Sequence, residues 1–308
     1  MQLIRGLSGK GFSGGAGCVV TIGSYDGIHL GHRALLARLA GHAARLTLPA
    51  VLLTFEPLPR EYLLPDDPPA RLTSLRERWR ILETTPLDYL WLLRFGESLR
   101  NLTAEAFAQL LAGRLDARVV VVGHDFRFGR NGEATAAVLA AAGTRLGFAV
   151  DVVDPVTLDG ERISSSGVRA ALARGDFERA ARWLGRPWSM RGRVATGEQL
   201  GRNLGFPTAN LPLERRRAPV AGIFAVRVHG VASEALPGVA SLGTRPTVGG
   251  VTALLEAHLF DFSGDLYGRE LEVEFAAKLR EEARFASLEA LTAQMRCDAA
   301  DARRILAA

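Results

Sequence analysis

Two histidines and several glycines stand together in the segment TIGSYDGIHLGHRALL, residues 21–36. His29 and His32 lie three residues apart at the expected start of a helix, so their side chains share one face of it. Gly31 allows a ligand to approach the backbone between them, and Gly23 belongs to the preceding turn. Free N–H groups and the positive end of the helix dipole attract anions at such a place. The segment therefore predicts a binding site for phosphate groups.

A second glycine-rich segment, RGRVATGEQLGRNLGFPTANL, covers residues 191–211. A loop of this composition can wrap phosphates with its backbone N–H groups, and its arginines add positive charge. The residues expected to contribute are Gly192, Arg193, Gly197, Gly201, Arg202 and Gly205. Thr208 and Asn210 follow in an extended stretch and point to the same side. A hydroxyl and an amide oxygen are hard ligands, so this pair predicts a Mg²⁺ ion held together with phosphates and water.

Glu256 lies in TALLEAHLFDF, residues 252–262, a strand-like run of mostly apolar residues. A carboxylate is costly there unless it is paired, exposed or used in chemistry. A solvent-facing strand position, which the periodicity favours, is the alternative, and the residues alone leave the choice open.

An aromatic loop follows the apolar run in VVVVGHDFRFG, residues 119–129. Asp125, Phe126 and Phe128 are suited to stack on a planar ring and to contact its polar edge. An ordinary loop packed on aromatic residues is the alternative.

A serine-rich helix start occurs in SSSGVR, residues 164–169. Ser164 and Ser165 could simply cap the helix, or they could bind phosphate together with Arg169 one turn later. The two roles can coexist.

The elements that must position these residues differ between the two parts of the chain. Short apolar runs alternate with segments of helical periodicity up to about residue 185, which predicts a parallel sheet covered on both faces. Such sheets bind ligands at the carboxyl ends of their strands. We expect strands at 18–23, 50–55, 89–94, 119–123 and 148–153, and helices at 30–46, 74–83, 103–115 and 168–184.

Strand-like runs then follow one another without a helix until a final one at 287–306. They cover 191–196, 222–230, 252–262 and 269–279. This order is typical of a small antiparallel β-barrel closed by a C-terminal helix. The sequence thus predicts two domains, residues 1–185 and 186–308.

Composition excludes several classes of protein. Of the 308 residues 48% are hydrophobic, ample for packed cores, and the net charge of +5 is spread along the chain with no basic stripe typical of nucleic-acid binding. Nearly all the positively charged residues are arginines. This reflects either a bias in composition or the use of some arginines to bind phosphates. Cys18 and Cys297 have no metal-ligand spacing, which favours a reducing cytoplasm. No leader-like or membrane-spanning apolar run occurs, so we expect no membrane partner. A weak homo-oligomer is a further expectation, and the residues leave the oligomeric state open.

Four segments in a fixed order carry a resemblance to a known family. HLGH is similar to the H-x-G-H signature of nucleotidylyltransferases. With TFEPLPREYL (54–63), VGHDFRFGRNGE (122–133) and ISSSGVRAAL (163–172), it resembles the adenylyltransferase half of bacterial bifunctional riboflavin kinase/FAD synthetases. GFPTANL resembles the riboflavin kinase motif G-x-P-T-A-N, and LREEARF (279–285) the flavin-side segment of that domain.

The resemblance implies a Rossmann-like nucleotidylyltransferase domain followed by a Greek-key barrel with a terminal helix. It also implies two reactions, ATP-dependent phosphorylation of riboflavin to FMN and adenylylation of FMN to FAD with release of pyrophosphate. Glu256 would accept the proton of the riboflavin hydroxyl, and Thr208 and Asn210 would position Mg²⁺. His29, His32 and Arg169 would act on the ATP phosphates in the first domain, and Asp125, Phe126 and Phe128 would lie near the flavin. The residues expected to bind ATP are Gly23, Gly31, Ser164, Ser165, Gly192, Gly201, Gly205 and Thr208.

Two departures from the family pattern keep an alternative open. Leu58 stands where the family often has a histidine, and the loop 129–133 is shorter than usual. The alternative is a riboflavin kinase whose first domain is a degenerate flavin-binding or regulatory relative. A different enzyme, which would adenylylate another phosphate ester or act on nucleic acid, is disfavoured by the kinase motif and by the dispersed charge.

Overall fold

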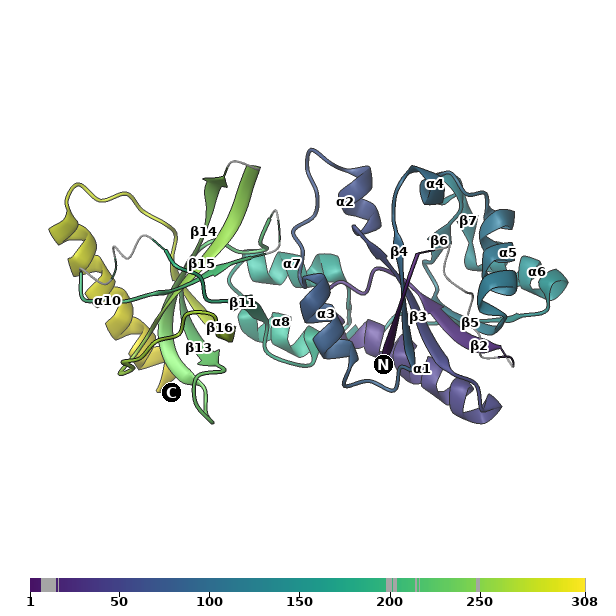
Figure 1. Ribbon diagram of the computed structural model, residues 1–308, viewed down its shortest axis with the longest axis horizontal. Helices are drawn as coiled ribbons and strands as arrows, with labels where there is room; N and C mark the ends of the chain where they lie inside the picture. The colour runs from purple at the N-terminus through teal and green to yellow at the C-terminus, as the bar shows by residue number, and fades with distance from the viewer. Residues whose placement is uncertain are drawn as a thin grey trace. The chain divides into compact units, whose positions relative to one another are not determined.

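The computed structural model describes residues 1–6, 15, 17–197, 201, 204–213, 215, 217–247 and 250–307 (Figure 1). Arg202, an expected phosphate ligand, lies outside these residues. Contacts divide the chain into unit 1, Met1–Pro69 with Arg78–Ser164, and unit 2, Ala70–Glu77 with Ser165–Ala308. The domain boundary expected after residue 185 stays a prediction. No helix of the described part is both long and apolar enough to span a bilayer.

Unit 1 is built on a six-stranded, all-parallel sheet in the order β1-β4-β3-β2-β5-β8. Its strands are β1 (Gln2–Arg5), β2 (Cys18–Ile22), β3 (Ala50–Glu56), β4 (Tyr89–Arg94), β5 (Ala117–Gly123) and β8 (Ala149–Val153). Five were predicted as apolar runs. The edge strand β1 was missed because it has four mostly exposed residues. The short strands are β6 (Arg127–Phe128), β7 (Ala134–Thr135), β9 (Thr157–Leu158) and β10 (Glu161–Arg162).

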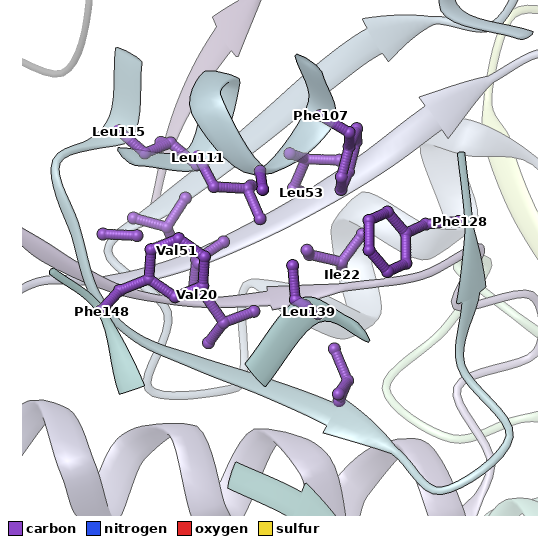
Figure 2. Close-up of a cluster of buried hydrophobic side chains, with 14 of the residues drawn as sticks. Val20, Ile22, Val51, Leu53, Phe107, Leu111, Leu115, Phe128, Leu139 and Phe148 are labelled. Carbon is purple, nitrogen blue, oxygen red and sulfur yellow. The ribbon is translucent and has the colours of Figure 1, made fainter. Parts of the chain in front are cut away.

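Helices cover both faces of this sheet, as predicted. The helices of this part of the chain are α1 (Leu30–Leu46), α2 (Pro59–Leu63), α3 (Leu75–Leu82), α4 (Glu97–Arg100), α5 (Ala104–Leu115) and α6 (Ala136–Leu146), and α3 begins in unit 2. Figure 2 shows Val20 and Leu53 of the sheet packed with Leu111 of α5 and Leu139 of α6. The alternate strand residues, such as Leu52, pack in a second cluster with α1. Alternation along each buried strand thus supplies both cores.

The helix expected at 168–184 is wrong as a single element. Unit 2 instead has α7 (Ser165–Ala173) and α8 (Phe177–Leu184). Gly175 has a φ of 76° and ends the first helix, and the Asp176 carboxylate caps the second by accepting a hydrogen bond from the Arg179 N–H at 3.0 Å. The apolar periodicity continues across this turn and hides it.

The rest of unit 2 is a nearly closed antiparallel barrel in the order β11-β16-β13-β14-β15-β12. Its strands are β11 (Ser189–Arg193), β12 (Ala209–Pro212), β13 (Gly222–His229), β14 (Leu236–Thr247), β15 (Gly250–Leu259) and β16 (Glu270–Arg280). The order β16-β13-β14-β15 is that of the expected Greek key. A bridge between Ala195 and Asn210 brings the two ends of the sheet together. Helix α10 (Leu288–Leu306) packs Ala302 against Ala225 and Phe260 of the barrel.

Segment 70–77 belongs to unit 2 because a buried ion pair holds it there. The carboxylate of Glu77 pairs with Arg215 and also accepts the backbone N–H of Arg191 at 2.8 Å. Trp188 Nε1 donates to the Leu72 carbonyl at 3.3 Å. Buried charges that are paired in this way are costly to break.

Candidate functional sites

The loop that joins β2 to α1 has an unusual backbone. Tyr25 and Ile28 adopt φ values of 50° and 45°, in the left-handed region that side chains normally avoid. Each such residue costs roughly 1–3 kcal/mol and persists only where the surroundings fix it. The loop is also buried, since Asp26 is 2% and Ile28 0% exposed.

The structure brings the two predicted histidines together at the start of α1. His29 is the N-cap, and its Nδ1 accepts a hydrogen bond from the His32 backbone N–H at 3.3 Å. The two rings stack with centroids 3.8 Å apart, and the Tyr25 ring lies 4.6 Å from the His32 ring. Burial, His29 and Arg78 lower the pKa of His32 well below its usual value, so this imidazole is neutral.

Ile163, the residue before the serine-rich segment, lies close to the start of α1. A Cβ atom on Gly31 would lie 3.0 Å from His29 Cε1 and 3.8 Å from the Ile163 carbonyl oxygen, so Gly31 permits this close packing. Ser164 follows Ile163 and is the last residue of unit 1. Ser165 and Arg169 belong to α7 of unit 2, where Arg169 Nε donates to the Ala70 carbonyl at 2.5 Å.

Gly23 lies at the beginning of the β2–α1 loop. Its backbone N–H donates to the Leu53 carbonyl at 3.1 Å, and a Cβ there would lie 3.1 Å from the Tyr25 ring. The absence of a side chain at Gly23 therefore leaves room for the aromatic ring that contacts His32.

An aromatic cavity of about 450 Å³ opens beside the end of β2. Its lining includes Ile22, Phe55, Phe95, Phe107, Phe126 and Phe128. Phe126 and Phe128 stack with centroids 5.5 Å apart at 16°, so both predicted aromatics face this cavity. The shortened loop forms a 3₁₀ turn, Arg130–Gly132, whose Asn131 and Gly132 also line the cavity.

Leu58, which replaces a frequent histidine, is 5% exposed and is the N-cap residue of α2. Its neighbour Pro59 lines the aromatic cavity.

Asp125 is held by a charged partner. Its carboxylate, 60% exposed, forms an ion pair with Arg162 of β10. Burial would raise the pKa of Asp125, but the hydrogen bond and positive charge of Arg162 outweigh it and lower the pKa. Because Arg162 lies two residues before Ser164, this pair connects the aromatic loop to the serine-rich segment.

The barrel contains a second cavity of about 280 Å³. Glu256 of β15 lies opposite Asn210 of β12 and Ser241 of β14 in the antiparallel register. Residues directly opposite each other share a face of the sheet. Glu256, Ser241 and Thr208 all line the cavity, so the predicted carboxylate faces it. Asn210 is buried, and its Nδ2 lies 3.4 Å from the Thr208 carbonyl.

The expected phosphate loop begins later than predicted. Gly192 lies inside β11, where its backbone pairs with Leu271, because strand pairing continues to Arg193. Its predicted phosphate contact stays a prediction. Gly201 lines the cavity, and Gly205 has a φ of 83°, which glycine adopts without strain.

Gly197 also packs closely in this part of the barrel. A Cβ there would lie 2.5 Å from the Asn210 side-chain Cγ, so glycine leaves room for the amide.

Sequence reasoning did not name several polar residues of the barrel cavity. His258 of β15 follows Glu256 by two residues, and its Nδ1 lies 2.9 Å from the Pro207 carbonyl oxygen. The period of two along a strand was the signal for it. Arg280 and Asp298 also line the cavity and form a bidentate pair at 2.9 and 2.7 Å. Arg280 lies in the segment 279–285 that resembles the family's flavin-side segment, but no local pattern connects it to Asp298 on α10.

Two protein-family models match the chain. The FAD synthetase model matches residues 13–167, and the riboflavin kinase model matches residues 184–306. A crystal structure described as a macrolide-efflux protein from Streptococcus pneumoniae covers 97% of both chains with a TM-score of 0.81 at 31% identity. The fold of the whole chain therefore has a counterpart in a solved structure.

Curated relatives described as bifunctional riboflavin kinase/FMN adenylyltransferase match over the full length. The relative from Escherichia coli (strain K12) is 45% identical over 304 residues, which cover 98% of this chain and 97% of the relative. The relative from Pseudomonas fluorescens is 46% identical over 309 residues, covering 100% and 98%. Together with the two family models, these matches show that the chain belongs to the bifunctional riboflavin kinase/FMN adenylyltransferase family.

Proposed function

We propose that the two activities of this family run at two separate sites, riboflavin phosphorylation in the barrel and FMN adenylylation at the carboxyl ends of the parallel strands. The observation that carries the second assignment is local to β2. Its last residue, Ile22, lines the aromatic cavity, and the loop to the stacked histidines begins at the next residue. A planar ring and phosphates can therefore bind on either side of one strand end. We assign riboflavin phosphorylation to residues 186–308 and FMN adenylylation to residues 1–185.

In the barrel, Glu256 accepts the proton of the riboflavin 5′-hydroxyl as its oxygen attacks the γ-phosphorus of ATP. The bond from that phosphorus to ADP breaks, and FMN and ADP result. The glycine loop, with Gly201, Gly205 and Thr208, binds the ATP phosphates through backbone and hydroxyl groups. The support is that Glu256 and Thr208 line one cavity.

The residues present fit the implied Mg²⁺ ion. Thr208 and Asn210 supply a hydroxyl and an amide oxygen, and no cluster of three His, Cys, Asp or Glu among the described residues offers another protein cage. When bound, the ion neutralises charge on the phosphates, and a partial oxygen shell completed by phosphates and water suits it.

Replacing Thr208 by Val tests this shell. The change keeps the shape but removes the oxygen, so the Mg²⁺ concentration for half-maximal FMN formation should rise roughly 10-fold. Thr208→Ser should restore it. Chelation of Mg²⁺ should stop FMN formation by the unchanged protein, and a Val variant with the same Mg²⁺ dependence would remove Thr208 from the shell.

In the adenylyltransferase part, a phosphate oxygen of FMN attacks the α-phosphorus of ATP, and the bond to the leaving pyrophosphate breaks. His29 and His32 stabilise negative charge on the phosphates, while Ser164 binds them. The phosphate contacts expected of Ser165 and Arg169, which belong to unit 2, stay predictions. Phe126 and Phe128 bind the flavin ring, and Asp125 contacts its polar edge.

The Asp298–Arg280 pair positions a wall of the barrel cavity. Asp298→Asn should raise the KM for riboflavin about 10-fold, because a charged hydrogen bond that orients Arg280 is lost. Asp301→Asn is the matched control, since Asp301 lies on the same helix and is exposed. An unchanged KM in steady-state FMN formation would show that Arg280 needs no such partner.

Incubation of the protein with riboflavin, ATP and Mg²⁺, followed by separation of the flavins, tests the whole assignment. FMN that is converted to FAD supports two working sites. FMN without FAD would instead support a degenerate first domain, which Leu58 and the short loop keep as the alternative. We further propose that the protein works in the cytoplasm on these small molecules, without nucleic-acid or membrane partners and with at most weak self-association.

A further inference from the structure

Arg78 of α3 places a buried positive charge beside the histidine site. Its side chain is 1% exposed. Nη1 donates to the Ser24 carbonyl at 2.7 Å, and Nη2 donates to the Glu56 carboxylate at 2.7 Å. Because the guanidinium is enclosed, it cannot contact a substrate bound at the surface of the site.

The contact with Ser24 fixes the start of the strained loop. Ser24 immediately precedes Tyr25, which has a positive φ, and the Ser24 carbonyl also lies 3.4 Å from the hydroxyl of Thr54. The loop ends at His29. The guanidinium fork donates to Glu56 with one nitrogen and to the Ser24 carbonyl with the other, and it therefore helps to hold a backbone that would otherwise relax.

The charge of Arg78 also acts on the histidines. Arginine stays protonated in proteins, and its positive charge disfavours a second cation nearby. Arg78 contributes, after burial and His29, to the lowered pKa of His32. The His32 imidazole thus remains a neutral hydrogen-bonding group in the field of a fixed cation.

We propose that Arg78 is a positioning residue for FMN adenylylation, holding the loop that presents His29 and His32 to the ATP phosphates. This inference rests on the proposed role of the two histidines. Interactions that strengthen only in the transition state affect kcat rather than KM. A misplaced histidine pair should therefore slow the chemical step more than it weakens substrate binding.

The test compares Arg78→Met and Arg78→Lys with Arg80→Met, a matched control on the same helix whose side chain is exposed. FAD formation from FMN is followed with the full chain. Arg78→Met should lower kcat about 100-fold and leave the KM for ATP within about 3-fold. Arg78→Lys should recover part of kcat, because it keeps the charge but lacks the fork. FMN formation by the two Arg78 variants should match that of the unchanged protein. Arg80→Met should match the unchanged protein in both activities.

Circular dichroism shows whether each variant folds, and only a folded variant is used to judge the inference. If Arg78→Met does not fold, Arg78→Lys carries the test: a lowered kcat with unchanged KM supports the inference, and a full kcat overturns it. A folded Arg78→Met with full kcat also overturns it. If Arg78→Met raises the KM for ATP and leaves kcat unchanged, Arg78 contributes to binding, and its role in positioning the histidines for the chemical step is rejected.

The combined His29→Ala and His32→Ala variant separates the two possible failures. If that variant still makes FAD at the normal rate, the proposed histidine site itself fails. If it is inactive while Arg78→Met is fully active, only the role of Arg78 is refuted.

Discussion

Replacement of Glu256 by Gln is expected to stop FMN formation while FAD formation from supplied FMN continues. Gln has nearly the same shape, so the strand pairing with Asn210 and Ser241 should persist. An amide cannot accept the hydroxyl proton, and loss of a general base lowers rates by about 100-fold to 10,000-fold. Chromatographic separation of riboflavin, FMN and FAD over time measures both activities in one protein.

Glu274→Gln is the matched control for this experiment. Glu274 is also a barrel carboxylate, on β16, and it pairs with His229 at 3.2 Å. It should leave FMN formation near normal. Loss of both activities in a folded Glu256→Gln protein would contradict separate sites, and FMN formation close to the normal rate would remove Glu256 as the base.

The parts of the fold that could be predicted have local signals. The strand at Cys18–Ile22 is a short apolar run, a glycine turn follows, and an amphipathic helix begins at the predicted Leu30. Each signal lies within a few residues of the next, so no distant partner is needed to read it. The same holds for most strands of the parallel sheet.

Strand β14 could not be predicted in this way. It contains Pro237, Gly238 and Pro246, residues that usually mark turns. Its pairing with both β13 and β15 outweighs these weak preferences. The outcome depended on neighbours that the local sequence does not reveal.

Arg78 illustrates the same limit at the site. Arg76, Arg78 and Arg80 alternate along LRERWR, and nothing local distinguishes the middle one. Arg76 and Arg80 are exposed, while Arg78 is buried next to residues of strand β3 and the β2–α1 loop. Residue type and spacing therefore predicted His29 and His32, which bear recognisable chemistry, but not the buried cation beside them.

Replacing both His29 and His32 by Ala should block FAD formation while FMN accumulates from riboflavin. Removal of a single preorganised hydrogen-bond donor from a transition state costs about 100-fold to 1000-fold, so the double change should cost at least about 1000-fold. The barrel does not use these residues and supplies FMN as an internal control. Undiminished FAD synthesis would remove the histidines from the mechanism.

A structural explanation of that loss must be separated from a chemical one, because His29 also caps α1. An alanine N-cap costs about 1 kcal/mol of stability, whereas asparagine is a good N-cap. His29→Asn should therefore keep the thermal unfolding temperature near that of the unchanged protein and still lose most FAD formation. If His29→Asn were fully active, the imidazole would serve only the helix, and the stacked pair with His32 would have no role in the transfer of the adenylyl group.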